Sequence, residues 1–371
     1  MHRQQQPSDR CPQRSGQHGF SLIELMVSIA ISLLLLAGVV TMFIGSKESY
    51  ETSERLSRVQ ENGRYALDQI VDDLRSAGFQ GCAKPNFATS RANDYAVTTL
   101  NNPTALLNNF AAPVQGFDAG AGGGTWTPAL DAAITAGLGP SNISDVLALH
   151  VPRRDAVAMH LTVRQTAGTD PLTVGNVVPA PLSAGDIAMI SDCTGRAWFQ
   201  VTTYAGGVIT HTQSGVPAGG TPPGNASADL KHPFDVGAEI VPAVTVIYYI
   251  RPSPADPTTS SLYRRSTSPG GVLTEELADG IERLEFQYGV DTVGGDGRID
   301  QYVTANAVTN WEEVISVRVA LLARATEAYG RDLDRRTYVL FDGTAAIGPF
   351  NDRFERRVFT TTVALRNQVI D

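Results

Sequence analysis

The sequence predicts an α+β protein in which one long N-terminal helix packs on a mainly antiparallel β-sheet domain. An apolar run followed by an amphipathic pattern at helical spacing predicts the helix. Short segments rich in β-branched and aromatic residues, all after residue 145, predict the strands. The 35 glycines and 21 prolines are spread along the chain, which is typical of many turns between short strands.

The first half of the predicted helix is long and apolar enough to cross a membrane. No charged residue occurs over the 22 positions between Glu24 and Lys47. A helix of that length extends about 33 Å, which matches the hydrocarbon core of a bilayer. The excess of arginine precedes the run, so we expect the N-terminal leader to stay cytoplasmic and the remainder to face outward.

The second half of the predicted helix has one apolar face. Gly78 is a plausible helix end, so a helix over 21–77 would be ~85 Å long, with Gly45 and Gly63 as flexible points. A coiled coil is the alternative, but the sequence lacks sustained heptads. The apolar positions are Leu56, Val59, Ala66, Leu67, Ile70, Val71, Leu74 and Ala77.

The remainder of the chain is expected to form the sheet domain. Residues 80–145 are rich in Asn, Ala, Gly and Pro, and we expect an irregular surface segment there. In the run 314–322, Val317, Val319 and Leu321 alternate with Arg318 and Ala320, which predicts one buried face and one wetter face. The expected strands are Val146–Val151, Met159–Arg164, Asp186–Ile190, Ala197–Tyr204, Val244–Ile250, Ile281–Tyr288, Val314–Leu322 and Val358–Leu365.

These patterns divide the chain into four segments. We expect a leader peptide over 1–19, a transmembrane half-helix over 20–44, an amphipathic half-helix over 45–78, and a periplasmic β-rich domain over 79–371.

A short motif marks the boundary between the leader and the helix. Glu24 interrupts the apolar run one turn after its start, and a carboxylate at that depth in a membrane is costly without a partner. Gly19, Phe20 and Glu24 together resemble the type IV prepilin motif Gly-Phe-x-x-x-Glu. The resemblance implies that a prepilin peptidase cuts after Gly19 and methylates the new amine of Phe20. It also implies that Glu24 pairs with the amino terminus of a neighbouring subunit.

Removal of the leader changes the cysteine count and the charge. Cys11 would be lost, which leaves Cys82 and Cys193 in a chain exported to an oxidising compartment. We predict a disulfide between them, closing a loop of about 110 residues and contributing roughly 4–5 kcal/mol. Two separate buried thiols are the alternative. The leader carries three arginines and one aspartate, so its removal takes the net charge from −9 to −11. That balance argues against a nucleic-acid partner.

Longer stretches resemble the PilW family of minor pilins. They cover most of the mature chain and match least well over about 85–145 and 206–235. The resemblance implies a low-abundance subunit that primes pilus assembly and can occupy the filament tip. The stretches are Val59–Leu67, Leu74–Cys82, Gly185–Asp186, Ser191–Cys193, Phe199–Thr202, Tyr248–Ile250, Leu262–Arg264, Gly280–Glu282, Tyr288–Asp291, Trp311, Val317–Val319 and Leu365–Asn367.

The implied partners are other minor pilins, the major pilin, prepilin peptidase, the inner-membrane assembly platform and, before assembly, membrane lipid. The implied location is the inner membrane, with one span and a periplasmic domain, and later the filament at the cell surface. A minor pseudopilin of type II secretion and a tip adhesin are the alternatives.

No motif for catalysis or a cofactor is evident. The mature chain has four histidines without zinc-binding spacing, and it lacks a Gly-x-Ser-x-Gly elbow, so we expect a protein that is not an enzyme. One acidic loop, residues 291–300, could offer Asp291, Asp296 and Asp300 to calcium. It lacks the EF-hand pattern, and a polar hairpin with an Asp-Gly turn is the favoured interpretation.

Overall fold

The structure is a computed structural model of the whole chain. It describes residue 19 and residues 21–81, 95–120, 123–130, 139–155, 157–175, 177, 179–215, 223–268, 271–293, 296–328 and 332–368.

The elements comprise one α-helix, two short 3₁₀ helices and sixteen strands within these described residues. The helices are α1 Leu22–Ser76, η1 Ala305–Ala307 and η2 Trp311–Glu313. The strands are β1 Tyr95–Thr98, β2 Val114–Phe117, β3 Val146–Pro152, β4 Met159–His160, β5 Leu172–Thr173, β6 Ile187–Asp192, β7 Gly195–Gln200, β8 Thr203–Ala205, β9 Val208–Thr210, β10 Glu239–Pro252, β11 Ser260–Ser268, β12 Gly271–Asp279, β13 Ile281–Val290, β14 Gln301–Val303, β15 Val314–Arg324 and β16 Arg356–Ala364.

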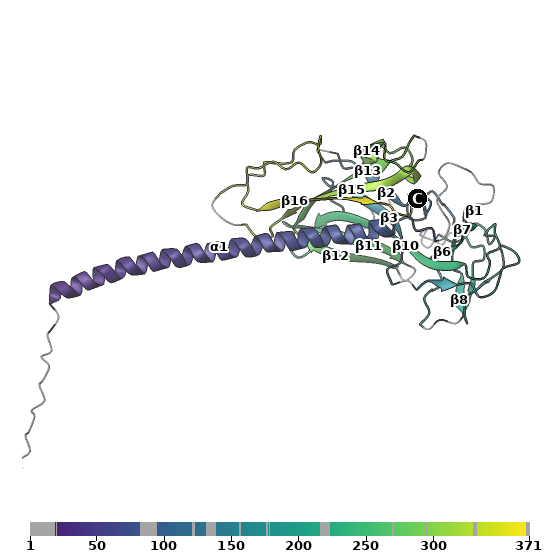
Figure 1. The fold of residues 1–371 in the computed structure, drawn as a ribbon, viewed down its shortest axis with the longest axis horizontal. Coiled ribbons are helices and arrows are strands. Elements are labelled where there is room, and N and C mark those ends of the chain that lie inside the picture. The colour runs from purple at the N-terminus through teal and green to yellow at the C-terminus, as the bar shows by residue number, and fades with distance from the viewer. Residues whose placement is uncertain are drawn as a thin grey trace, which may run out of the picture. The chain divides into compact units, whose positions relative to one another are not determined.

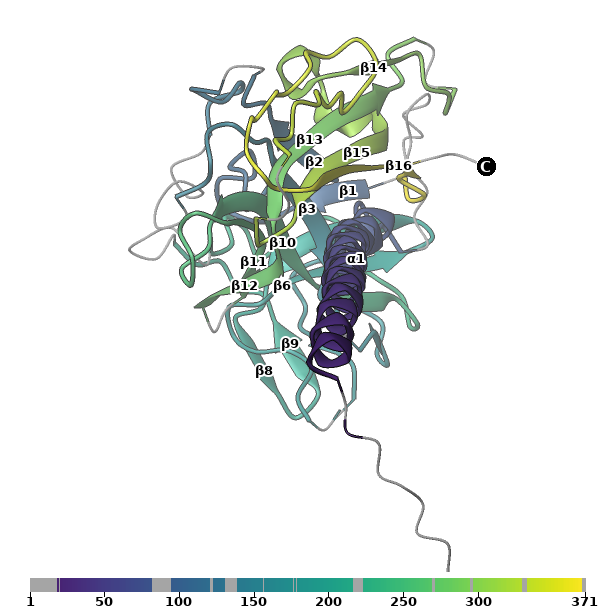
Figure 2. The same cartoon turned by 90° about the vertical axis from the view of Figure 1, so that its left-hand side faces the viewer.

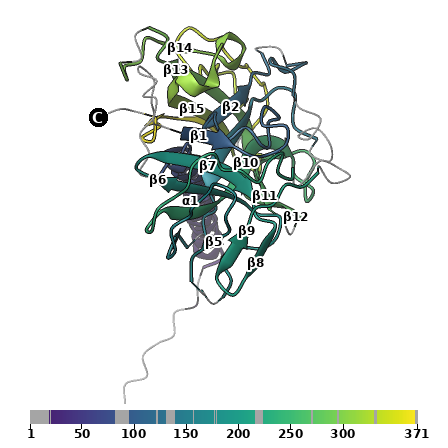
Figure 3. The same cartoon turned by 90° about the vertical axis from the view of Figure 1, so that its right-hand side faces the viewer.

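The strands form three sheets. The nine-stranded sheet follows the order β1-β7-β6-β10-β11-β12. Three further strands join it: β3 and β4 both pair with β10, and β2 pairs with β3. The second sheet has the order β14-β13-β15-β16, and the third is a small sheet of β5, β9 and β8. Only the pair β1–β7 is parallel among the pairs in the described residues. In all three views, the four-stranded sheet lies above the nine-stranded sheet, and the small sheet lies at the opposite end (Figures 1, 2 and 3). The predicted α+β class is confirmed.

The chain divides into two compact units, residues 1–54 and residues 55–371. Helix α1 begins in the first unit and ends in the second, so its last turns belong to the globular unit. The helix ends next to Gly78, which has a φ of +66° and whose amide donates to the carbonyl of His150 at 3.2 Å. A positive φ of this kind is readily adopted by glycine and stops the helix.

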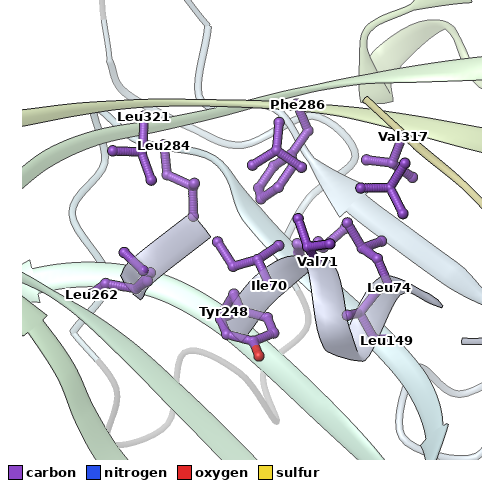
Figure 4. Close-up of a cluster of buried hydrophobic side chains, with 14 of the residues drawn as sticks. Ile70, Val71, Leu74, Leu149, Tyr248, Leu262, Leu284, Phe286, Val317 and Leu321 are labelled. Atoms are coloured by element: carbon purple, nitrogen blue, oxygen red, sulfur yellow. The ribbon is translucent and has the colours of Figure 1, made fainter. Parts of the chain in front are cut away.

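The main core lies where the end of α1 meets both larger sheets. Buried positions of α1 are Val59, Gly63, Ala66, Ile70, Val71, Asp73 and Leu74, and most of them follow the predicted apolar face. Figure 4 shows Ile70, Val71 and Leu74 between side chains of the two sheets, with Tyr248 and Leu262 on one side and Phe286 and Val317 on the other. The helix therefore fills the space between two sheets rather than covering one, because both sheets turn an apolar face toward it.

Strand β15 is buried on both faces, unlike the expectation of one wetter face. Val317, Val319 and Leu321 join the core under α1, as the alternation predicted. Ala320 and Leu322 are also buried, because they pack in a separate cluster with Tyr338, Leu340 and Phe341 from the segment between β15 and β16. The alternation within the strand does not predict this burial, because the covering residues come from the long connection between β15 and β16.

The segment 80–145 is more ordered than expected. Its described parts hold strands β1 and β2, and Leu106, Phe110 and Phe117 are buried at 4%, 5% and 2% exposure. Two predicted strands are also shorter or divided. The run 159–164 contributes only β4, and the run 197–204 is divided between β7 and β8 because the chain turns into the small sheet.

Candidate functional site

The N-terminal end of α1 is built by Ser21 and Glu24. The Ser21 amide donates to the Glu24 carboxylate at 3.0 Å, and the Ser21 carbonyl accepts from Leu25 at 3.1 Å. A Glu at this position satisfies an otherwise free amide at the helix start, where a negative charge also interacts well with the helix dipole. Gly19 is exposed just before this turn, whereas Phe20 lies outside the described residues. Sequence reasoning did not foresee this local partner for Glu24.

The turns of α1 after Glu24 are apolar and exposed. The helix holds a window of 18 residues with mean hydropathy 2.6 and no buried side chain, so by length and composition it could cross a membrane. An isolated helix in water would not retain so much apolar surface, because burying it in lipid or against like helices is strongly favourable. Its most exposed apolar side chains include Leu22, Ile23, Leu34, Leu35, Met42 and Phe43.

The globular end of α1 approaches strand β16 unusually closely at Gly63. A Cβ at Gly63 would collide with the ring of Phe359, whereas a Cβ at Gly45 would meet nothing within 4 Å. The two glycines proposed as flexible points therefore differ. Gly45 is open, but Gly63 lies against Phe359, so a side chain at Gly63 would have to displace the Phe359 ring or the helix.

A buried ionic cluster, the Asp73 clasp, fixes the last turns of α1. Asp73 is 2% exposed. Its carboxylate accepts from Arg264 Nε at 2.8 Å, from Tyr248 Oη at 2.6 Å and from Arg154 Nε at 2.9 Å. Burial, followed by the charge of Asp73, raises the pKa of Tyr248, so that its hydroxyl stays a donor. One helix carboxylate thereby holds side chains of β10, β11 and the loop after β3.

No direct signal in the sequence singles out Asp73, since Asp72 and Asp73 look alike in a helix of alternating charge. Asp72 is exposed, and among the described residues its ion pair is with Arg75, at 4.0 Å. A signal was available in the helical period, because Asp73 lies three residues after Ile70 and falls on the apolar face.

A second ionic cluster surrounds Arg356 at the start of β16. Its side chain is 1% exposed and contacts Glu282 at 2.7 Å, Asp352 at 2.6 Å and Asp334 at 3.2 Å. Arg324 also approaches Glu282, at 3.3 Å. These ion pairs join β13 and β16 to the long connection before β16. The cluster therefore holds that connection in place over β15.

The acidic loop, residues 291–300, uses its carboxylates on its own backbone. Asp300 Oδ2 accepts from the amides of Thr292 and Val293, both at 2.8 Å. Asp291 Oδ2 accepts from the amide of Gly297 at 2.7 Å, and Asp296 Oδ1 accepts from the amide of Arg298 at 3.0 Å. Among the described residues, no group of three His, Cys, Asp or Glu side chains is placed to hold a metal. Each of the three carboxylates thus binds a backbone amide of the loop, and calcium binding by Asp291, Asp296 and Asp300 stays a prediction.

The predicted disulfide lies partly outside the described residues. Cys193 is exposed in the turn between β6 and β7, whereas Cys82 is not described. The chain before Cys82 does reach this turn, because Ser191 Oγ donates to the carbonyl of Gln80 at 2.9 Å, and a Cβ at Gly81 would meet Ser191. The disulfide between Cys82 and Cys193 remains a prediction. Residues close to the two cysteines in sequence, Gly81 and Ser191, lie side by side.

The same turn brings Asp192, Thr194 and His232 together. Thr194 Oγ1 lies 2.6 Å from Asp192 Oδ1 and 2.9 Å from His232 Nε2. Asp192 Oδ2 is 3.5 Å from the same Nε2 atom. In a nucleophilic triad the base accepts from the hydroxyl with one ring nitrogen and donates to the carboxylate with the other. Here both contacts fall on one nitrogen, so the geometry does not activate Thr194.

The remaining histidines occupy three different places. His150 is 3% exposed in β3, and its two ring nitrogens lie 2.7 and 2.8 Å from backbone carbonyls. His211 is also buried, with Nε2 3.0 Å from the carbonyl of Asp170, whereas His160 is exposed. None joins another histidine in a ligand set within the described chain.

A polar cavity of about 480 Å³ opens beside β13. Asp118, Asp145, Arg283 and Glu285 contribute its charged lining. Asp145 also bridges the sheets, because it accepts from the amides of Ala119 and Phe286. Burial raises the pKa of Asp145 to about 8, with a smaller effect of the neighbouring carboxylates. Burial likewise raises the pKa of Glu285. The cavity therefore holds fewer negative charges at neutral pH than its composition suggests.

Two family models match this chain. The model described as "Type IV Pilus-assembly protein W" matches residues 247–367, which run from β10 to beyond β16. The model described as "Prokaryotic N-terminal methylation motif" matches residues 14–40, which include Gly19, Phe20 and Glu24. No curated protein matches the chain. The two matches fall on the two features that the structure sets apart, the start of α1 and the sheets that hold its end.

Proposed function

This chain is a PilW-family type IV pilin, and from that membership we propose that it is a minor subunit that primes pilus assembly and occupies the filament tip. Its N-terminal helix anchors it in the inner membrane before assembly, with the leader in the cytoplasm and the globular unit in the periplasm. The observation that carries the proposal is the exposed apolar helix that begins at Leu22, has Glu24 in its first turn and continues into a large folded domain.

In the first proposed step, prepilin peptidase cleaves the chain after Gly19, which frees the amino group of Phe20. The same enzyme then methylates that amino group. The apolar helix then moves from lipid into a bundle of like helices, where Glu24 pairs with the amine of a neighbouring subunit. Opposite charges in a low-dielectric bundle attract strongly, and each is costly without the other. Because Glu24 is held by the Ser21 amide in the precursor, the new pairing must replace or share that bond.

Two substitutions distinguish charge pairing from helix capping. Glu24→Gln keeps an acceptor for the Ser21 amide, since Gln also serves in a capping box, but it removes the charge. Glu24→Val removes both. If pairing is the role, both variants stay in the membrane fraction and are missing from sheared pili. Incorporation of Glu24→Gln at the wild-type level would show that the side chain only caps the helix.

Processing and orientation are tested on the same protein. Replacement of Gly19 by a bulky residue should leave a longer, uncleaved band on a gel. Protease added to the periplasmic side of spheroplasts should degrade the globular unit, and digestion that requires disruption of the membrane would contradict the orientation.

The rival is a minor pseudopilin of type II secretion, which shares the N-terminal motif. A deletion strain separates the two roles, because loss of a pilin abolishes or reduces surface pili and leaves protein secretion intact. Loss of secretion with normal piliation would favour the pseudopilin.

A further inference from the structure

One connection of the globular unit crosses the nine-stranded sheet as a strap, defined here as residues 102–112. It is anchored at one end by the bridge between Leu100 and Asn225 and at the other by strand β2. Leu106, Phe110 and Ala112 of the strap are buried at 4%, 5% and 2% exposure. The strap therefore covers apolar surface, although its sequence has no regular period.

Few polar contacts hold the strap between its ends. Within the described chain, three contacts of hydrogen-bond length join side chains of the sheet to strap carbonyls. Thr245 Oγ1 donates to the carbonyl of Leu107 at 3.0 Å. The other two involve His150, whose Nδ1 lies 2.7 Å from the carbonyl of Ala112 and whose Nε2 lies 2.8 Å from the carbonyl of Leu106. The ring of Phe110 also contacts the imidazole, with centroids 4.8 Å apart. One imidazole thus faces two of the three strap carbonyls that the sheet contacts.

The two carbonyls place opposing demands on that ring. A neutral imidazole has a single N–H, so it donates to one carbonyl and directs a lone pair toward the other. An imidazolium would donate to both, but it would be a cation in a site that is 3% exposed. A buried cation without a counter-ion is strongly disfavoured, because it loses its hydration.

Among the residues that the structure describes, none that surrounds His150 is such a counter-ion. Thr245 lies opposite it on β10, Phe110 packs on the ring from the strap, and the amide of Gly78 bonds to its carbonyl from the end of α1. The groups that act on its titration are burial and the two carbonyls, without a contribution from any charged side chain. Burial lowers the pKa of His150 and outweighs the opposite effect of the carbonyls.

We propose that His150 is an acid-sensitive latch, and that its protonation releases the strap and exposes the apolar surface beneath it. The imidazole is neutral when the strap is closed, and opening hydrates the ring so that it can take a proton. Since the closed state resists the proton, the latch is fully closed above the ordinary histidine pKa near 6.5 and weakens as the pH falls below it. The latch does not depend on the proposed role in the pilus.

Amide hydrogen exchange of the full chain in detergent tests the latch. We expect the protection of strap peptides, corrected for the intrinsic pH dependence of exchange, to fall between pH 7 and pH 5. Each pH unit below the open-state pKa corresponds to about a tenfold loss of protection, until the pKa of the closed state is reached. Peptides of β15 should keep their protection and serve as the internal reference. Strap protection that is constant, or that rises on acidification, overturns the proposal.

Two variants identify the responsible group. His150→Gln keeps a donor but cannot titrate, so its strap should lose the acid dependence. His160→Gln removes an exposed histidine and should behave as wild type. An equal acid response in His150→Gln would overturn the proposal. If that variant does not fold, exchange at the imidazole C2 position in the wild-type chain decides, since His150 must titrate below the ordinary histidine pKa near 6.5. A midpoint at or above that value contradicts the latch.

Discussion

Removal of the Asp73 carboxylate should destabilise the globular unit far more than removal of its neighbour Asp72. In Asp73→Ala, Arg264 keeps its buried position, with a side chain 8% exposed, but loses its closest anion. Tyr248 loses the acceptor at 2.6 Å. Breaking one side of a buried ion pair typically costs about 3–5 kcal/mol.

The expected cost lies at the lower end of that range. Glu275 stays 3.6 Å from Arg264 and compensates part of its charge, although Glu275 is nearly half exposed. The side chain of Arg154 is 44% exposed and can turn to water. We therefore expect Asp73→Ala to lower the free energy of unfolding by about 3 kcal/mol. Asp72→Ala removes only an exposed contact at 4.0 Å and should cost less than about 0.5 kcal/mol.

Urea unfolding of the full chain in detergent measures both values, with the fluorescence of the three tryptophans as the signal. The double variant Asp73→Leu with Arg264→Met adds a further check, because replacement of both charges leaves no buried ion unpaired. It should be more stable than Asp73→Ala. Equal midpoints for Asp73→Ala and Asp72→Ala would refute the claim that the clasp holds the helix to the sheets.

Four other outcomes follow from the structure. Gly63→Ala should destabilise the globular unit by about 1–3 kcal/mol, because its methyl group overpacks against Phe359, whereas Gly45→Ala should not lower the midpoint of the same urea curve. Burial raises the pKa of Asp145 from 3.8 to about 8, so its contribution is favourable at low pH and is lost as the pH rises through that window. Asp145→Asn should flatten this part of a plot of Tm against pH, and an unchanged slope would count against it. Non-reducing mass spectrometry of the mature chain should show no free thiol, and Cys193→Ala should lower stability by roughly 4–5 kcal/mol. Millimolar calcium should leave Tm and the calorimetric baseline unchanged, since the carboxylates of the acidic loop already accept from backbone amides, and a measurable heat of binding would restore the calcium site.

Several features of the fold were predictable because their physical cause lies within a few turns of chain. The apolar run, its length and the helix end at Gly78 depend on local period and local backbone freedom. The observed helix Leu22–Ser76 accordingly agrees with the predicted 21–77 within one residue at each end. The same applies to long, apolar strands such as β3, β13 and β15, whose predicted and observed bounds differ by at most two residues.

Other features depend on residues that are distant in sequence. Strands β11 and β12 were not predicted, because they carry many charged and polar side chains, including Arg265, Glu275 and Glu276. They form a hairpin because β10 offers a long edge to pair with. The burial of Ala320 and Leu322 likewise depends on Tyr338, Leu340 and Phe341, which belong to the long connection between β15 and β16.

The candidate site also combines features that the local sequence predicts with features that depend on the folded structure. The motif Gly19, Phe20 and Glu24 is a local feature of the sequence, and the family match there needs no fold. The bond from the Ser21 amide to Glu24 depends on the helix start and could have been anticipated from the Ser-x-x-Glu spacing.

The sequence by itself determined the anchor, the helix and the class of the protein, because each depends on hydrophobic period and on neighbours within a few residues. Only the tertiary structure decided which helix carboxylate is buried, that Gly63 lies against the Phe359 ring, and that His150 faces two carbonyls at once. These properties arise where segments more than 30 residues apart along the chain come into contact, and no local pattern records the partner.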